Sequence, residues 1–396
     1  MSTTSVDTKI DALAEDLRKL IPEASKEEIS RKKLFGVIQQ AMGQVEAPVE
    51  TIWRMIMSPH APAALNVIIR MGVLDDLVAA GKPKPAQDLG SACKVDPILI
   101  VRMMRPLVAL GIFQETDVQT YDSTPISQTL VAPPLVGGYL FMFECATRSL
   151  ANMPNYLEST GFQNVTGGPG PFETSHNTED GMFQYLNKNP ALMSSFNAFM
   201  SGSLETRKSW FETFPVQEIL LEGASTDPDS VLLIDIGGGE GHDVEAFRRT
   251  FPDAPGKLVL QDLPPTIDNI KHLDPVIITQ KYDFFTEQTI KGARAYYFRN
   301  IFHDWPTDRC VVMLKNVAAA MKPGYSKLLI FEWVIPAKSV PLYPALLDIN
   351  MMAVLNGQER TEEQWIAMLG QAGLEVNKFW KAGEDSEGLI EVVLKK

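Results

Sequence analysis

Cysteines, basic residues and long apolar runs are scarce in this sequence. Its 396 residues include only three cysteines, which are far apart and odd in number, so neither a disulfide framework nor the clustered spacing of a metal site is expected. Lysine and arginine number 36 against 49 acidic residues, a formal charge of −13. Nucleic acids and anionic membranes both require a clustered positive surface, so we expect neither as a partner.

Membrane-spanning and export signals are also lacking. The longest apolar stretch, residues 130–145, is shorter than a membrane span and contains Pro133 and Pro134. The first twenty residues are polar and amphipathic, without the apolar centre of a signal peptide. We therefore expect a cytoplasmic protein with reduced thiols, in which Cys145 and Cys310 are small buried apolar residues.

Helical patterns dominate the first 125 residues. Residues 1–50 are typical of a solvated helix with mixed charge, and apolar residues recur at helical spacing over 65–73. Another helix is expected over 96–111, with a short hairpin over 112–121. Helices followed by a small hairpin indicate a winged helix. Because no basic recognition helix is present, dimerisation is favoured over DNA binding.

Residues 126–225 are expected to be mostly helical, broken by the turn-rich stretch 161–171. His176, beside that stretch, could line the substrate entrance, but an exposed position is favoured. Phenylalanine and methionine are frequent here, and their usual place is the core. Methionine flexibility also suits a pocket for an irregular organic ligand, so we expect this region to connect two domains and line a substrate site.

Short apolar runs appear from Ser230 onward, each followed by a loop and a helical stretch. Strands that are buried on both faces and alternate with helices define a parallel α/β sheet. The sequence therefore predicts a Rossmann-like, doubly wound, mostly parallel sheet over residues 226–396, following the 1–125 and 126–225 regions. The predicted strands are 231–235, 258–262, 295–298, 327–331 and a closing strand at 388–394.

A glycine-rich loop directly follows the first of these runs. Residues 235–241 read Asp-Ile-Gly-Gly-Gly-Glu-Gly. Gly237 and Gly239 allow a sharp turn from strand to helix and the close approach of a ligand to bare backbone. Asp262 ends the next strand, where a carboxylate can accept both hydroxyls of a ribose. The combination of strand, loop, helix, strand and acid predicts a nucleoside site.

The acids around the loop indicate which nucleoside binds. A dinucleotide fold has the pattern G-x-G-x-x-G, with a helix N-terminus facing a pyrophosphate. Here the third glycine comes one residue early, and Asp235 and Glu240 flank the loop. Carboxylates repel phosphate but suit a cation. S-adenosylmethionine, a phosphate-free nucleoside that carries an ammonium and a sulfonium, is therefore favoured over NAD.

A histidine follows another predicted strand. His303 lies just past the strand's carboxyl end, where open α/β sheets bind ligands. Histidine is the natural general base near neutral pH, so His303 is a catalytic candidate. Glu332, at the end of the next strand, and Glu359 could orient the imidazole. A carboxylate bonded to one ring nitrogen raises the basicity of the other.

Six segments together carry a family resemblance: 235–241, 261–264, 283–285, 299–306, 351–352 and 359–361. With them the sequence resembles the S-adenosylmethionine-dependent O-methyltransferases of the caffeic acid and fungal natural-product type, from about residue 50 to the end. The resemblance implies a homodimer formed through the N-terminal winged-helix region, and a small-molecule substrate.

The resemblance also assigns roles to individual residues. It implies a catalytic base at His303, with orienting acids at Glu332 and Glu359. Trp333 departs from the methionine that the family usually has there, which marks a difference in the pocket or in packing. The implied cofactor contacts lie at Gly237, Asp262, Asp283, Phe284 and Arg299.

The expected reaction is methyl transfer to a hydroxyl of a bulky natural product. His303 would take the hydroxyl proton while the oxygen attacks the methyl carbon of the sulfonium. A second hypothesis stays open, because some fungal relatives with this fold are pericyclases that keep S-adenosylmethionine bound without moving the methyl group. There the sulfonium and a cation such as Arg299 would polarise a carbonyl. We favour methyl transfer because the base and both acids are present.

Overall fold

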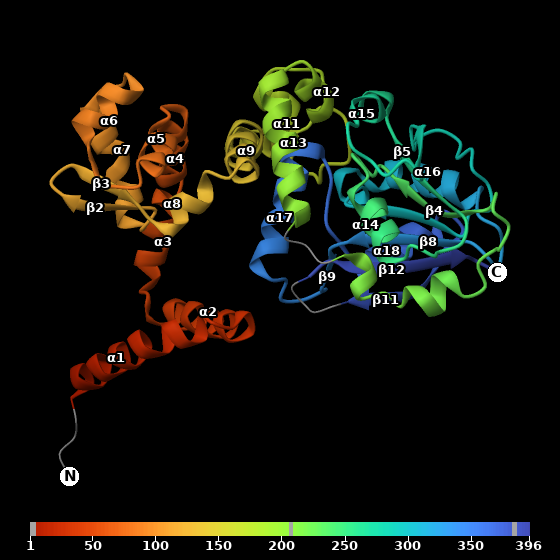
Figure 1. Ribbon diagram of the computed structural model, residues 1–396, viewed down its shortest axis with the longest axis horizontal. Helices are drawn as coiled ribbons and strands as arrows, with labels where there is room; N and C mark the ends of the chain where they lie inside the picture. The colour runs from red at the N-terminus through yellow and green to blue at the C-terminus, as the bar shows by residue number, and fades with distance from the viewer. Residues whose placement is uncertain (1–4, 206–208, 382–385) are drawn as a thin grey trace, which may run out of the picture. The chain divides into compact units, whose positions relative to one another are not determined.

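Two units divide the chain after Ser127, and each is considered by itself. The computed structural model describes residues 5–205, 209–381 and 386–396 (Figure 1). No helix within these ranges is both long and apolar enough to cross a bilayer.

The first unit is mostly helical, with a small antiparallel sheet in the order β1-β3-β2. The predicted hairpin is confirmed. The helix after Asp96 is confirmed too, and its first turn is capped by the Asp96 carboxylate, which accepts from the Ile98 N–H at 2.8 Å. The elements are α1 (Val6–Ala24), α2 (Glu28–Val45), α3 (Pro48–Met57), α4 (His60–Arg70), α5 (Val73–Ala80), β1 (Lys84–Pro85), α6 (Ala86–Cys93), α7 (Pro97–Ala109), β2 (Phe113–Asp117), β3 (Thr120–Ser123) and α8 (Pro125–Leu130).

One helical pattern is split in two. The apolar spacing over 65–73 predicts a continuous helix, but α4 ends at Arg70 and α5 begins at Val73. Gly72 lies between them with φ +72°, a left-handed conformation that breaks the α-helical path and that glycine adopts without a Cβ penalty. The pattern nonetheless identifies the core, since Leu65, Ile68 and Val73 are all buried.

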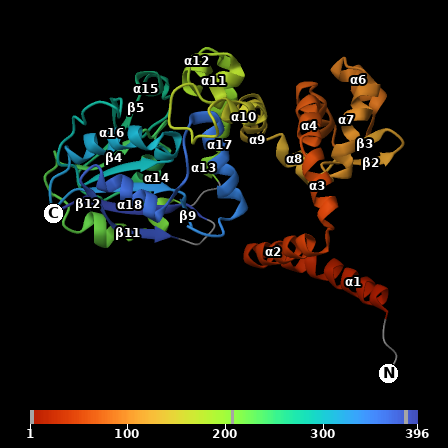
Figure 2. The same ribbon diagram turned by 180° about the vertical axis from the view of Figure 1, so that it is seen from behind.

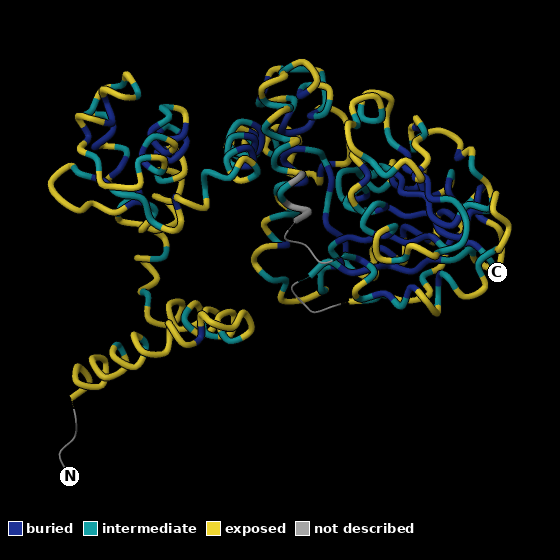
Figure 3. Tube along the Cα trace, viewed as in Figure 1, coloured by how far each residue is buried: buried dark blue, intermediate teal, exposed yellow. Residues whose placement is uncertain are grey.

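Helices α1 to α3 are exposed along most of their length, as Figure 3 shows. Ala24 is the one buried residue that these three helices contain among the described residues. Large apolar side chains such as Ile10, Phe35, Trp53 and Ile56 are more than half exposed. Many exposed large apolar side chains in one segment are typical of an interaction site.

The second unit begins with a helical layer that packs partly through close backbone approach. Its elements are α9 (Pro133–Phe141), the π-helix η1 (Met142–Thr147), α10 (Arg148–Ser159), α11 (Pro171–His176), α12 (Met182–Asn187), α13 (Pro190–Glu205) and α17 (Leu342–Leu355). The short helices η2 (Trp210–Glu212) and η3 (Gln217–Leu221) follow α13 in the chain and pack against the sheet. Gly137 brings α9 against α13, because a Cβ there would lie 2.7 Å from the Ser195 carbonyl oxygen. Phe141, Phe172 and Leu186 form the buried centre of this layer.

The expectation that His176 is exposed is wrong. Its ring is buried and stacks on Phe172, with 4.1 Å between the ring centroids. Its Nε2 atom lies 3.1 Å from the carbonyl oxygen of Glu144, and its Nδ1 atom lies 2.8 Å from the Ser175 hydroxyl. His176 therefore serves to hold α11 against η1.

A seven-stranded sheet forms the centre of the second unit, with helices on both faces (Figures 1 and 2). Its order is β11-β12-β8-β7-β4-β5-β6, and β12 runs antiparallel to both of its neighbours. This arrangement confirms the predicted doubly wound, mostly parallel fold. The strands are β4 (Val231–Ile236), β5 (Lys257–Asp262), β6 (Ile278–Lys281), β7 (Ala295–Arg299), β8 (Lys327–Glu332), β11 (Leu374–Lys381) and β12 (Gly388–Leu394).

An apolar core lies between each face of the sheet and the helices that cover that face. Helices α16 (Thr307–Ala318) and α18 (Glu362–Gly370) cover one face, and α14 (His242–Thr250) with η2 and η3 covers the other. Alternate residues of one strand serve the two cores, as Tyr296 and Tyr297 show. Shorter elements complete the unit: α15 (Pro264–Asn269), η4 (Phe302–Asp304), and the strand pair β9 (Val334–Ile335) and β10 (Arg360–Thr361).

Candidate active site

The glycine loop turns sharply out of β4 through three left-handed residues. Gly237, Gly239 and Gly241 have φ values of +70°, +60° and +87°. A Cβ at Gly237 would lie 2.8 Å from Cδ1 of Ile301, so the loop packs directly against the segment that leads to His303. A Cβ at Gly239 would meet nothing within 4 Å, which leaves that side of the loop open to a ligand.

Asp262 braces this loop from the end of β5. Its Oδ2 atom accepts from the Gly239 N–H at 2.8 Å, and its Oδ1 atom accepts from the Leu263 N–H at 2.7 Å. Burial raises the pKa of this carboxyl, and the two N–H donors oppose that effect. Each oxygen keeps a second lone pair, so the carboxylate can still accept the hydroxyls of a ribose.

Asp235 lies beneath the loop rather than beside it. It is 1% exposed, and a Cβ at Gly238 would lie 2.6 Å from its Oδ2 atom. Burial raises its pKa well above the usual range, and the charges of Asp243 and Asp262 add to this effect. Its Oδ2 atom has no hydrogen-bond partner among the described residues, which is a costly state for a buried acceptor. Asp235 therefore keeps one unused acceptor oxygen beneath the open glycine loop, and a cation bound at the loop would favour the charged form of this carboxyl.

Arg299, an expected cofactor contact, is held by other side chains. Its NH1 atom lies 2.6 Å from Oδ1 of Asp243, and its NH2 atom lies 3.6 Å from Oε2 of Glu387. The other oxygen of Asp243 accepts from the Tyr297 hydroxyl at 2.7 Å. The guanidinium is therefore neutralised inside the protein.

Asp283 and Phe284 follow β6 at the same end of the sheet. The Phe284 ring borders the loop, since a Cβ at Gly237 would lie 3.7 Å from it, and its centroid lies 6.2 Å from that of Trp305. Asp283 is exposed, and its side chain accepts from the Phe285 N–H at 2.9 Å. Phe284 thus provides an apolar wall beside the loop, and Asp283 provides a solvent-facing acid.

His303 lies in the one-turn helix η4, between two carboxylates. Its Nδ1 atom lies 2.8 Å from Oε1 of Glu359, and its Nε2 atom lies 3.4 Å from Oδ1 of Asp304. The imidazole side chain is 12% exposed. Glu359 fixes the orientation of the ring, and Nε2 is the nitrogen left to receive a proton from a substrate.

Glu332 supports the backbone of this turn rather than the imidazole. From the end of β8, its Oε1 atom accepts from the N–H groups of Ile301 at 3.0 Å and Phe302 at 2.6 Å. Its hydrogen bonds among the described residues go to backbone rather than to His303, although its charge contributes to the pKa of that residue. The predicted pair of orienting acids therefore separates into one acid on the ring and one on the backbone.

The segment that carries Glu359 is attached to the histidine turn along its length. The Gln358 N–H donates to the His303 carbonyl at 3.0 Å, and the buried Arg360 donates to the carbonyls of Phe302 and Trp305, both at 2.7 Å. Gly357 permits this approach, because a Cβ there would lie 1.9 Å from the His303 carbonyl oxygen.

The electrostatics of the cluster favour a protonated imidazole. Burial lowers the pKa of His303, but the charges of Asp304, Glu359 and Glu332 outweigh it and raise that pKa to about 10. Burial raises the pKa of Asp304 to about 6 and that of Glu332 to about 7, each opposed by the charge of His303. The cluster therefore gives His303 a high affinity for a proton, and the residue acts as a base only in the fraction of molecules whose imidazole is neutral.

Three contacts were not expected from the sequence. Asp304 adjoins His303 in the chain, so its adjacency was a usable signal. Asp243 lies in the first turn of α14, where it meets Arg299. Asp348 accepts from the Glu359 N–H at 2.8 Å across eleven residues, and no pattern in the sequence marks it.

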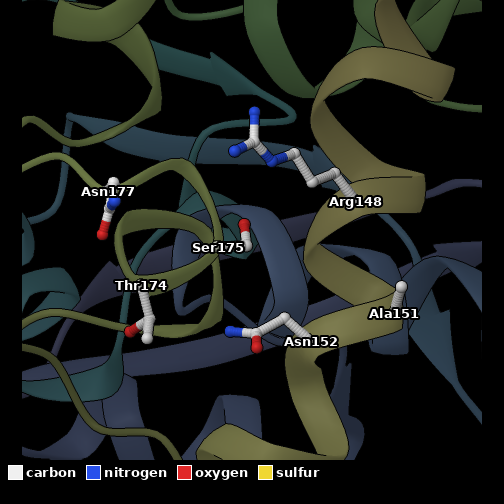
Figure 4. A pocket seen from close by; sticks show the side chains of 6 residues that line it. All are labelled: Arg148, Ala151, Asn152, Thr174, Ser175 and Asn177. Carbon is white, nitrogen blue, oxygen red and sulfur yellow. The ribbon is translucent and has the colours of Figure 1, made fainter.

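A polar cleft of about 390 Å³ lies between α10 and α11 (Figure 4). Arg148 and Asn152 line it from α10, and Thr174, Ser175 and Asn177 line it from the other side. None of the expected site residues lines it, so it is separate from the histidine cluster.

A Rossmann-like sheet, an acidic glycine loop and a carboxylate-held histidine together define a cofactor-dependent methyltransferase. The model of the O-methyltransferase domain matches residues 166–375, and that of the O-methyltransferase dimerisation domain matches residues 53–133. The chain belongs to the O-methyltransferase family. It is an S-adenosylmethionine-dependent O-methyltransferase.

Two fungal relatives match most of the chain. O-methyltransferase asqD of Emericella nidulans is 37% identical, over 84% of this chain and 86% of its own length. Demethylsterigmatocystin 6-O-methyltransferase of Aspergillus flavus is 30% identical, over 94% of this chain and 95% of its own.

Two solved structures share the fold over nearly all of both chains. LepI in complex with S-adenosylmethionine has a TM-score of 0.87 at 25% identity, covering 99% of this chain and 100% of that one. A structure described as a pericyclic reaction enzyme has a TM-score of 0.86 at 26% identity, covering 98% and 99%. The fold therefore accommodates both of the activities expected from the sequence.

Proposed function

We propose that this protein methylates a phenolic hydroxyl of a bulky natural product, with His303 as the general base. The observation that carries the proposal is the Nδ1 contact of His303 with Glu359 at 2.8 Å. This contact leaves Nε2 as the only ring nitrogen that can take up a substrate proton. The turn that bears His303 also packs, through Ile301, against the open glycine loop.

Each residue of the histidine cluster has a separate role in the proposed reaction. Bound S-adenosylmethionine supplies an electrophilic methyl group. Glu359 holds the ring and favours the proton on Nδ1, Glu332 fixes the backbone of the turn, and His303 accepts the hydroxyl proton at Nε2. A well-positioned general base contributes roughly 10²–10⁴-fold to the rate. Placing the reacting atoms in line contributes further, through entropy already lost on binding.

A phenol suits this base better than an alkyl alcohol. The carboxylates raise the pKa of His303 to about 10, close to the value of roughly 10 for a phenol such as the tyrosine side chain. Proton transfer between groups of similar pKa is nearly balanced, whereas an alkyl alcohol is a far weaker acid. Because a phenol loses its proton far more readily than an alkyl alcohol does, an aromatic hydroxyl is the methyl acceptor that we propose.

The substrate class has separate support. Residues 126–225, which we propose as the connecting and substrate-lining region between domains 1–125 and 226–396, supply many phenylalanine and methionine side chains. One relative is named for methylating demethylsterigmatocystin, which supports a fused aromatic or similarly bulky acceptor. Trp333, with its ring 5.7 Å from that of Tyr343, is the position where this chain would differ from its relatives in pocket shape.

We propose that the cofactor is held by the glycine loop and its neighbours. Gly237 and Gly239 would offer bare backbone, Asp262 would accept the ribose hydroxyls, and Phe284 would stack on the base. A bound cation would favour ionisation of Asp235 beneath the loop, and the resulting carboxylate would in turn stabilise that cation. Asp283 and Arg299 complete the proposed contacts, although the pairing of Arg299 with Asp243 supports an indirect role for the arginine.

We propose that two copies associate through the first unit. The match to a dimerisation domain over 53–133 and the exposed apolar side chains of α1 to α3 both support a homodimer. The three cysteines are unpaired, which supports a cytoplasmic location.

A pericyclase remains the second candidate, because a pericyclic enzyme shares the fold. The two activities differ in the fate of the methyl group. Incubation of the protein with S-adenosylmethionine and a panel of phenolic polyketides, followed by quantification of S-adenosylhomocysteine, separates them. Methyl transfer predicts one equivalent of S-adenosylhomocysteine per product, whereas product without it would overturn the proposal.

A further inference from the structure

The glycine loop is held from the strands on both sides of β4. From β5, Asp262 accepts from the Gly239 N–H, and the Gln261 carbonyl accepts from the Gly237 N–H at 2.7 Å. From β7 the connection is made by Asp243, in the first turn of the helix that the loop leads into. The β5 side contains the acid already proposed for the ribose, and the β7 side contains Arg299, which is bound to Asp243.

Asp243 bridges two residues of β7. Tyr297 and Arg299 lie two positions apart on that strand and therefore project from the same face. The Tyr297 hydroxyl donates to Oδ2 of Asp243 at 2.7 Å, and Arg299 donates to Oδ1 at 2.6 Å. The side chains of Asp243 and Arg299 are 15% and 10% exposed, so this ion pair is largely removed from water.

Asp243 compensates a positive charge that would otherwise oppose binding of the cofactor. Arg299 is a largely buried cation at the end of the sheet where the cofactor, itself a cation, is proposed to bind. A second carboxylate, that of Glu387, makes a longer ion pair with Arg299 at 3.6 Å, so Asp243 at 2.6 Å is the nearer of the two compensating charges. Without Asp243, Arg299 would keep only the longer ion pair with Glu387, and the part of its charge left uncompensated would repel a sulfonium in a site of low dielectric constant.

We infer that Asp243 is a positioning residue that neutralises Arg299 and so allows the loop to accept a positively charged cofactor in preference to its neutral thioether product. The inference rests on the proposed cofactor site. It assigns the arginine to charge balance rather than to direct contact with the cofactor.

S-adenosylmethionine and S-adenosylhomocysteine provide the test, because they differ by one methyl group and one positive charge. Titration calorimetry on the full chain measures both dissociation constants. In Asp243→Asn the amide keeps the shape of the side chain but leaves Arg299 poorly paired. We expect S-adenosylmethionine to bind on the order of tenfold more weakly, and S-adenosylhomocysteine less than about threefold more weakly. A purely structural role would weaken both ligands equally.

Further variants isolate the charge. Arg299→Gln removes the cation, so the ratio of the two affinities should move toward S-adenosylmethionine. The double variant Asp243→Asn/Arg299→Gln should return the ratio to within about threefold of the wild type. Asp229→Asn removes an exposed acid that pairs with Lys257 at 2.6 Å on the far end of β5, and it should change neither constant.

The outcomes separate this inference from the proposed function. If the wild type binds neither ligand, the cofactor site itself is wrong. If the wild type binds both and Asp243→Asn weakens them equally, the inference is overturned while the site stands. If Asp243→Asn fails to fold, Arg299→Gln decides alone. An equal loss of both ligands in that variant would make the arginine a direct contact and contradict the inference.

Discussion

The Nδ1 atom of His303 lies 2.8 Å from Oε1 of Glu359, across a separation of 56 residues. The contact depends on the segment from Gly357 to Arg360, which is bonded to the histidine turn at several points. An imidazole held in this way has one nitrogen committed to the protein and one available for chemistry. The predictions below test the consequences of that arrangement.

Replacing the base should abolish transfer without emptying the cofactor site. In His303→Ala the proton acceptor is lost, and we expect the turnover number to fall by roughly 10²–10⁴-fold. Calorimetry should show S-adenosylmethionine binding close to that of the wild type, because the loop and Asp262 are untouched. His272→Ala, at an exposed histidine, is the matched control. Unchanged turnover in His303→Ala would remove this residue from the mechanism.

The pH dependence of the reaction should report the carboxylates around His303. The base acts when it is neutral, and its pKa is raised to about 10, so kcat/KM should rise with pH from neutrality toward that value. Glu359→Gln removes one cause of the raised pKa, so the midpoint should move to lower pH while the maximum falls. Glu363→Gln, on the exposed start of α18, should leave the midpoint in place. If the midpoint of the pH profile is the same in Glu359→Gln as in the wild type, His303 held by Glu359 is not the titrating base.

The stability of the protein should respond to Glu332 in a defined direction. Burial raises the pKa of Glu332 from 4.5 to about 7 in the folded protein. Its contribution to stability is therefore fully present below pH 4.5 and is lost as the pH rises through 7. Glu332→Gln keeps an oxygen to accept from Phe302 but cannot ionise. Thermal unfolding should show that the stability of the variant, relative to that of the wild type, increases between pH 5 and about pH 8. A fall in the relative stability of the variant over this pH range would contradict the raised pKa of Glu332.

Gly357 should tolerate no side chain. A Cβ there would lie 1.9 Å from the His303 carbonyl oxygen, so Gly357→Ala must displace the segment that bears Glu359. We expect a loss of about 1–3 kcal/mol in the free energy of unfolding, together with reduced turnover. Gly370→Ala is the matched control, because its Cβ would meet nothing within 4 Å. If both alanine variants behave alike, the close approach has no functional meaning.

The apolar helices of the first unit should control association. Trp53→Glu places a charge on the exposed apolar face of α3 and should shift the protein toward monomer in sedimentation equilibrium. Ile366→Glu changes an equally exposed apolar residue on α18 and should leave the association state as it is. A wild-type protein that sediments as a monomer would contradict the proposed homodimer.

The sequence predicts the central strands and the glycine loop because both are local patterns. Buried parallel strands such as β4 and β8 are continuous apolar runs, and a left-handed turn requires glycine. The edge strand β6 and the strand β11 were not expected. Their residues are largely exposed, and a solvated strand lacks the apolar run that marks a buried one.

The remainder of the site depends on contacts that are distant in sequence. His303, Glu332 and Glu359 were found because each stands at a recognisable position in its own motif. The separate tasks of the two glutamates follow from register: Glu332 reaches backbone N–H groups from β8, while Glu359 reaches the ring. Asp348 and the burial of His176 depend on how helices pack, which residue order alone does not determine.

The fate of the methyl group tests the central claim most directly. The wild-type protein is incubated with S-adenosylmethionine labelled with deuterium on its methyl group, together with phenolic polyketides that include demethylsterigmatocystin, and the products are examined by mass spectrometry. We predict a product carrying the labelled methyl group on oxygen, with an equal amount of S-adenosylhomocysteine, and roughly 10²–10⁴-fold slower formation of both by His303→Ala. A rearranged product without the label and with the cofactor intact, or no conversion of any phenol by the cofactor-loaded protein, would contradict the account.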